Sequence, residues 1–145
     1  MMKKIMALTV AAVFALISFA CKPAGKYGDL KEYLNDVIKA NEDYITALEK
    51  SSSAKEVAEA ITEMGEKLEK LVKRGEEIEK KYPEMKAWDK KNPPAEVKEE
   101  FEKMEAMSQK LLTVSMKMMK YMMDPEVMKA SQEMAKKVGQ TGVMK

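Results

Sequence analysis

Histidine is absent from this chain of 145 residues, and cysteine occurs only once, at Cys21. Without histidine there is no imidazole ligand for zinc, iron or haem, and no Ser-His or Cys-His catalytic pair. The six glycines are scattered, so the chain has no glycine-rich phosphate loop. General acid–base chemistry would fall to carboxylates, but the glutamates are interspersed with lysines, as on solvated helix faces. The sequence therefore predicts a protein that is not an enzyme and needs no cofactor.

An excess of one charge is also missing once the N-terminal segment is set aside. The chain has 26 basic and 24 acidic side chains, and two of the basic ones are Lys3 and Lys4. Removal of residues 1–20 leaves 24 side chains of each sign. Because a neutral domain offers no basic surface to a phosphate backbone, we expect no nucleic-acid partner.

Residues 1–20 have the pattern of an export signal. Lys3 and Lys4 precede an apolar run from Ile5 to Ala20. The run spans about 16 residues, whereas a helix that crosses the hydrocarbon core of a membrane needs about 20. Positive charge lies only in front of the run, as in a secretory signal. The pattern favours a cleaved signal peptide over a permanent transmembrane helix.

The signal ends in Ser18-Phe19-Ala20-Cys21, which resembles the lipobox of bacterial lipoproteins. Ala20 and Cys21 match this motif, whereas Ser18 and Phe19 stand where the family usually carries leucine and a small residue. Ser18 and Ala20 also satisfy the small-x-small rule of general secretion, so a conventional peptidase is the alternative for the same cut. Unmodified, the single cysteine would be an unpaired thiol in an oxidising compartment. The resemblance implies a lipid on Cys21.

The chain thus resembles the small helical lipoproteins of bacterial envelopes, which implies an exported protein held to membrane lipid through acylated Cys21. Lys22 is not the aspartate that commonly retains lipoproteins in the inner membrane, so the outer membrane is favoured where the cell has one. Residues 21–28 contain Pro23 and Gly25 and show no periodicity. We expect them to form a short tether.

Apolar residues at alternating spacings of three and four predict helices throughout residues 29–139. No strand pattern competes, and helices with a single apolar stripe must pack together to be stable. The predicted fold class is all-α, an up-down antiparallel helical bundle of three long helices plus a short C-terminal fourth. Residues 140–145 are expected to fray. The expected helices run from Asp29 to Lys50, from Ser53 (with Glu56 completing a capping box) to Tyr82, from Pro94 to Met123, and from Pro125, capped by Asp124, to Gly139.

Each long helix has a predicted buried stripe, and three residues interrupt the pattern. Asn41 would either fix the register of a buried seam or lie in water. Gly75 suggests the close approach of a neighbouring backbone, with a hinge as the alternative. Trp88 is expected to cap the core, with an exposed anchor for a partner or for lipid headgroups as the alternative. The stripes comprise Leu30, Leu34, Val37, Asn41, Tyr44 and Leu48; Val57, Ile61, Met64, Leu68, Leu71, Gly75, Ile78 and Tyr82; and Val97, Phe101, Met104, Ser108, Leu111, Ser115, Met118 and Met122.

Methionine is in excess, with nine of the 15 residues between Met104 and Met134. The five methionines of residues 116–123 cover roughly 160° of a helix, which is wider than a two-position seam. Three interpretations remain open. The first is core packing by flexible side chains. The second is a hydrophobic groove for an apolar ligand or a partner helix, and the third is a Cu(I) site of thioethers. The groove would use Met118, Met119, Met122 and Met123, and the Cu(I) site Met116, Met119 and Met123.

Taken together, the sequence favours a non-enzymatic structural or interaction module of the cell envelope. Cu(I) binding and carriage of an apolar ligand or partner helix are the alternative functions. Copper-handling envelope proteins with clustered methionines commonly add histidine or a second cysteine, and this chain has neither.

Overall fold

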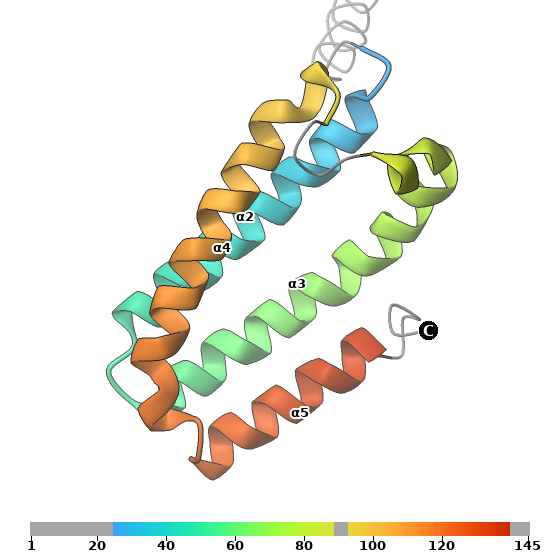
Figure 1. The fold of residues 1–145 in the computed structure, drawn as a ribbon. Coiled ribbons are helices and arrows are strands. Elements are labelled where there is room, and N and C mark those ends of the chain that lie inside the picture. The colour runs from blue at the N-terminus through green and yellow to red at the C-terminus, as the bar shows by residue number, and fades with distance from the viewer. Residues whose placement is uncertain (1–24, 89–92, 140–145) are drawn as a thin grey trace, which may run out of the picture.

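The computed structural model describes residues 25–88 and 93–139. The expectations for the signal peptide, Cys21 and residues 140–145 lie outside these ranges. Within them every regular element is helical, which confirms the all-α class (Figure 1). The long helices are α2 (Gly28–Lys50), α3 (Ala54–Lys81) and α4 (Lys98–Met118), the shorter α5 is Pro125–Gly139, and short 3₁₀ helices occupy η1 (Pro83–Ala87), η2 (Ala95–Val97) and η3 (Met119–Tyr121).

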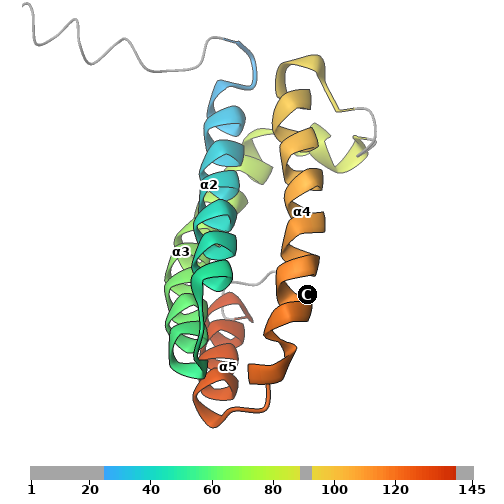
Figure 2. The same ribbon diagram turned by 90° about the vertical axis from the view of Figure 1, so that its left-hand side faces the viewer.

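The helices alternate in direction along the chain and pack in the order α4, α2, α3, α5 (Figures 1 and 2). α2 lies between α3 and α4, and α5 lies along α3. α4 runs parallel to its neighbour α2, because α3 runs back towards the end where α2 begins and α4 starts at that same end. Among the described residues, α4 and α5 make almost no contact with each other. The three long helices and the shorter fourth therefore form an open bundle.

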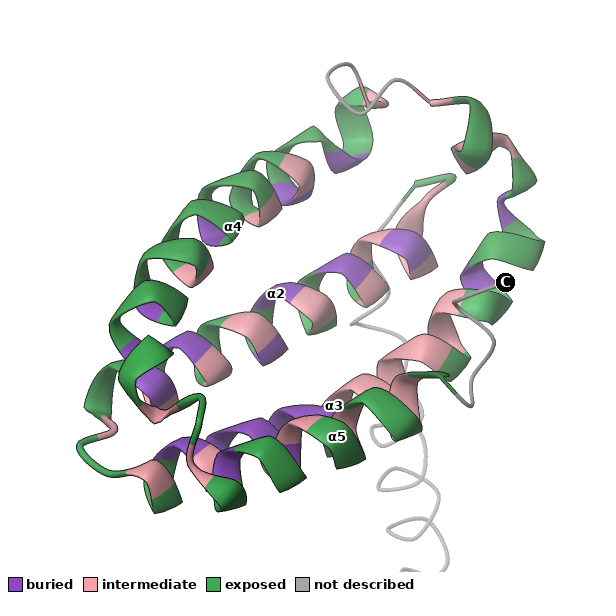
Figure 3. Cartoon of the chain, turned by 60° about the horizontal axis from the view of Figure 1, so that its bottom comes forward, coloured by how far each residue is buried: buried purple, intermediate pink, exposed green. Residues whose placement is uncertain are grey.

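The core has two parts at opposite ends of the bundle. One is built around Leu30 and Val97, and the other around Val57 and Val127. All four side chains are fully buried, and each lies in or next to the first turn of a helix. Burying a side chain of this size contributes roughly 1.5–3 kcal/mol. The buried positions lie on the inward faces of the helices (Figure 3).

Exposed ion pairs join α2 to α3 along their length. Asp29 pairs with Lys81 near the start of α2, and Arg74 pairs with both Asp36 and Glu32 further along it. Near the other end, Lys67 Nζ lies 2.9 Å from Asp43 Oδ2. Their exposure to water makes each pair a small contribution to stability that weakens as salt is added. They line the edge of the α2–α3 interface.

Five of the eight positions in the predicted stripe of α3 are buried, and Leu68, Leu71 and Gly75 are half-buried. The predicted stripe of α4 is only half right. Val97 and Met118 are buried as expected. Between them, Met107 and Val114 are buried where Ser108 and Ser115 were predicted, and these serines are exposed. The side with Met107 and Val114 packs in one cluster with Ile38 and Ile45 of α2, and none of the described helices covers the other side. A helix with one neighbour buries a single flank of its stripe.

α2 buries residues next to its predicted stripe as well. Ile38 and Ile45 are buried, whereas Val37 and Tyr44 are half-buried. The reason is that α2 has helices on two sides, so a single stripe underestimates its buried surface. Asn41 is also half-buried, and its Nδ2 donates to the carbonyl of Val37 at 2.8 Å. Because this bond stays within one helix, it does not set the register between helices.

Side-chain contacts explain the other two residues that interrupt the stripes, Gly75 and Trp88. An added Cβ on Gly75 would lie 2.7 Å from Tyr33 Oη, so the expectation of a neighbouring backbone is wrong, and a tyrosine side chain needs the space. Trp88 packs on the Leu30 cluster, with its ring 5.1 Å from that of Tyr27 in a T-shaped contact. Trp88 thus caps the core, as predicted.

The predicted start signals of α3 and α5 are confirmed. Ser53 Oγ accepts from the Glu56 N–H, and the Glu56 carboxylate accepts from the Ser53 N–H at 3.1 Å, which is a capping box. Asp124 Oδ1 accepts from the Glu126 N–H at 2.9 Å. For α2 the expectation was wrong by two positions, since Tyr27 is the N-cap residue and Asp29 lies in the first turn.

Replacing Ser53 with alanine is expected to lower the free energy of unfolding by about 1 kcal/mol, because a donor at the start of α3 loses its acceptor. Chemical denaturation would measure the change, with Ser108→Ala as the control, since the Ser108 hydroxyl bonds only to its own helix. An equal loss in both variants would contradict the role of the cap.

The backbone N–H and hydroxyl of Ser52 lower the pKa of Glu56 below its usual 4.5. The stability that the Glu56 carboxylate contributes through the cap is therefore present above pH 4.5 and is lost as the pH falls through its lowered pKa.

Candidate functional site

An apolar groove of about 460 Å³ lies between α4 and α5. It exists because α4 packs on α2 and α5 packs on α3, which leaves the facing sides of α4 and α5 apart. Its floor consists of Tyr44 and Leu48 from α2 and Val57 and Ile61 from α3. Its walls consist of Leu112, Ser115, Met116 and Met118 from α4, Met119 and Met122 from the turn that follows, and Ser131 and Met134 from α5.

The turn after α4 determines which methionines reach the groove. The α-helix ends at Met118, and η3 continues the chain with a tighter 3₁₀ turn. The Tyr121 hydroxyl donates to the carbonyl of Ser52 at 2.7 Å, which fixes this turn against the connection between α2 and α3. The Asp124 cap then starts α5 in the opposite direction.

The five methionines of residues 116–123 differ widely in exposure. Met118 is 8 % exposed and belongs to the core cluster around Val57 and Val127. Met116 and Met119 are each 67 % exposed, and Met122 is 48 % exposed. Of these five, core packing is therefore confirmed for Met118 alone, and the other four are open to water.

The predicted groove residues come together with one exception. Met118, Met119 and Met122 line the groove, whereas Met123 is 83 % exposed and lies outside the lining. Sequence reasoning missed the rest of the lining. Leu112 lay outside every predicted stripe, and Met134 was not among the predicted groove residues. The wide methionine arc was the only signal for this site.

The predicted Cu(I) residues are not all brought to one place. Met116 and Met119 line the groove, but Met123 does not. The expectation rested on α-helical spacing through position 123, and that spacing ends at Met118 because η3 follows. The described residues also contain no cluster of three or more acidic or cysteine side chains able to hold a metal ion.

The chemistry of the groove is that of apolar contact. Its lining contains no acidic or basic residue, and its polar groups are the hydroxyls of Tyr44, Ser115 and Ser131. Burial raises the pKa of Tyr44 above its usual value, so its hydroxyl is neutral at physiological pH. The arrangement can bind an apolar surface by removing it from water. Its serine hydroxyls have no acidic or basic residue of the lining beside them to activate them as nucleophiles.

No helix in the described ranges has both the length and the hydropathy to cross a membrane. Comparison of the chain with protein-family models, with curated proteins and with solved structures finds no match. The groove and the sequence signals are thus the observations that bear on function.

Proposed function

We propose that the chain is a non-enzymatic, lipid-anchored protein of the bacterial envelope whose methionine-lined groove binds an amphipathic helix of a partner protein. The observation that carries this proposal is the pair Met116 and Met119, both largely exposed on the walls of an uncharged groove. Soluble domains rarely leave large apolar patches in water unless the patches bind something.

The openness of the groove favours a helix as its occupant. Sites for small apolar ligands usually enclose most of the ligand surface. Here Met116, Met119 and Met122 remain half to two-thirds exposed, so the groove can cover only one side of an occupant. An amphipathic helix has one apolar side to bury and one polar side to leave in water. Unbranched thioethers adjust their rotamers to the apolar side that they meet.

The anchor is supported by the N-terminal sequence. The lysine-led apolar run, the Ala20-Cys21 junction and the lack of any second cysteine support acylation of Cys21 after export. Mass spectrometry of the mature N-terminus tests it, because an unmodified Cys21 would refute the anchor.

We expect Met119→Glu to weaken binding of a synthetic amphipathic peptide of leucine and lysine by about tenfold or more, which corresponds to about 1.4 kcal/mol. The substitution would place a carboxylate against the apolar side of the peptide, where no basic residue of the lining can pair with it. Fluorescence anisotropy of the labelled peptide measures the affinity. Because Met119 is largely exposed, the fold should tolerate the change.

Met123→Glu is the matched control, since Met123 is equally a methionine and more exposed but lies outside the groove. It should leave peptide affinity unchanged. Equal weakening by both variants would show that binding does not depend on the groove, and no binding by the unmodified protein would refute the helix proposal. Tight binding of a fluorescent fatty acid in place of the peptide would instead support the carrier alternative.

A further inference from the structure

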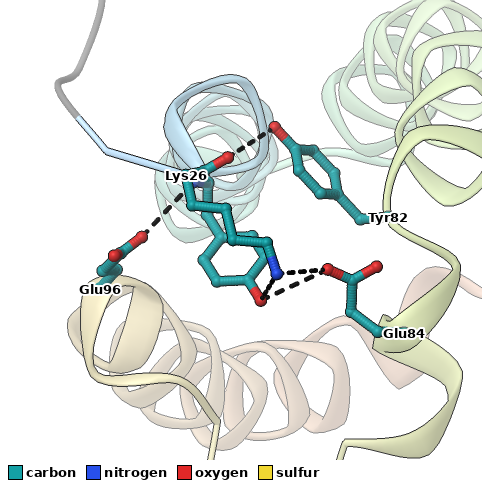
Figure 4. A network of polar contacts seen from close by, with 5 residues as sticks. Lys26, Tyr82, Glu84 and Glu96 are labelled. Atoms are coloured by element: carbon teal, nitrogen blue, oxygen red, sulfur yellow. Dashed lines mark hydrogen bonds and ion pairs between the residues drawn. The ribbon is translucent and has the colours of Figure 1, made fainter.

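The first described residues are bonded to the rest of the bundle. The Tyr27 N–H donates to Glu96 Oε2 at 3.4 Å, and the Tyr82 hydroxyl donates to the carbonyl of Lys26 at 3.1 Å (Figure 4). Lys26 Nζ lies 3.0 Å from Glu84 Oε1. Residues 25–27, which the sequence assigned to the tether, therefore form part of the folded end of the bundle.

The charges at this end are paired. Hydrogen bonds from Lys26 to Tyr27 and Glu84 raise the pKa of Lys26, and the pKa of Glu84 is lowered by a backbone N–H and by Lys26. Lys86 Nζ lies 2.7 Å from Glu79 Oε1. Lys26 and Glu84 therefore stay ionised at neutral pH, and this end presents paired charges of both signs.

Aromatic side chains gather beside these charges. The Tyr27 ring lies 5.1 Å from Trp88 and 5.4 Å from Tyr82. Tyr82 is buried, whereas Tyr27 and Trp88 keep part of their surface exposed. Tryptophan and tyrosine are the residues enriched where a membrane meets water, since their rings are apolar with one polar group.

Covalent geometry places this end near the anchor. Only residues 22–24 separate Cys21 from Gly25. Even fully extended, the link from Cys21 to Gly25 reaches no more than about 14 Å. The groove lies much further away, because Tyr44 and Leu48 follow Gly28 by 16 and 20 residues, or roughly 24–30 Å of helix.

Resting on the lipid anchor of the proposed function, we infer that the end formed by Tyr27, Trp88 and the Lys26–Glu84 pair contacts the phospholipid headgroup layer. The bundle then stands on the membrane by this end. The groove opens at the opposite end into the aqueous space, where a soluble or membrane-tethered partner helix reaches it without entering the bilayer.

Trp88 is the only tryptophan, so its fluorescence reports the position of this end directly. The test uses lipidated protein purified from bacterial membranes and reconstituted into vesicles of phosphatidylethanolamine and phosphatidylglycerol, with phosphatidylcholine spin-labelled on its headgroup as the quencher. We expect Trp88 to lose fluorescence as the quencher is increased. The control is the double variant Trp88→Phe/Met123→Trp, which moves the reporter to the exposed turn at the groove end and should not be quenched.

The outcomes separate this inference from the anchor on which it rests. Flotation of the protein with the vesicles in a density gradient reports attachment through Cys21. Protein that floats but shows quenching at neither position, or equal quenching at both, overturns the end-on arrangement and leaves the anchor intact. Protein that does not float refutes the anchor and the arrangement together.

Discussion

Gly65→Leu is expected to lower the free energy of unfolding by about 3 kcal/mol and to loosen α5 from α3. Gly65 is buried, and a Cβ at this position would lie 3.3 Å from Met134 Cβ and 3.5 Å from its Cα. The close approach involves the backbone of α5, so rotation of the Met134 side chain cannot relieve it. A leucine would force the two helices apart and expose Val127, which is fully buried at their interface.

Chemical denaturation measures the loss of stability, and hydrogen exchange of the α5 amides measures how far α5 separates from α3. Gly139→Leu is the control, because no atom lies within 4 Å of an added Cβ there. Gly65→Ala should fall between the two, since alanine favours a helix by about 1 kcal/mol and offsets part of the crowding. Unchanged protection of α5 in Gly65→Leu would contradict the tight α3–α5 contact. Release of α5 should also abolish peptide binding, since Ser131 and Met134 form one wall of the groove.

Lys31→Met is expected to destabilise the bundle by about 3 kcal/mol at neutral pH. Glu100 is 2 % exposed, and its Oε1 lies 3.3 Å from Lys31 Nζ. Its Oε2 has no hydrogen-bond partner among the described residues. Loss of Lys31 would leave a buried carboxylate without its cation, which costs much more than the loss of an exposed pair.

Glu100→Met should have the opposite sign, with stability unchanged or raised by about 1 kcal/mol, because a methionine of similar size needs no partner in the core. Denaturation of both variants at the same pH distinguishes the two effects. Lys73→Met provides the control, because Lys73 pairs with Glu69 on the surface of α3 and its loss should change stability little. A similar loss in the Lys31 and Glu100 variants would show that the pair itself stabilises the fold.

Helix boundaries were predictable where local chemistry sets them. The Ser53–Glu56 box and Asp124-Pro125 act within one turn, so the sequence contains all that determines those starts. The buried flank of α4 was not predictable. Met107 and Ser108 are adjacent on one helix, and which of them is buried depends on whether α4 has one neighbour or two. Contacts between segments that are far apart in the sequence determine which of the two is buried.

The groove was predictable only as an excess of methionine. The arc of residues 116–123 is too wide for one seam, but methionine serves equally well in a core and on an open surface. Met118 is in the core and Met119 is in the groove because α4 ends between them. Tertiary packing against Ser52 fixes that end through Tyr121, and no pattern in the sequence marks it.

The packing order α4, α2, α3, α5 gives the molecule a mechanical property. It consists of two helix pairs, α4 with α2 and α5 with α3, joined along the α2–α3 interface. The two walls of the groove belong to different pairs, so the width of the groove depends on the angle between the pairs at the α2–α3 interface. We expect a small rotation about the α2–α3 interface to widen or narrow the groove away from the turn that Tyr121 fixes against Ser52. Ion pairs such as Asp43–Lys67 border this interface, and salt screens such exposed pairs. Added salt should therefore make the rotation easier.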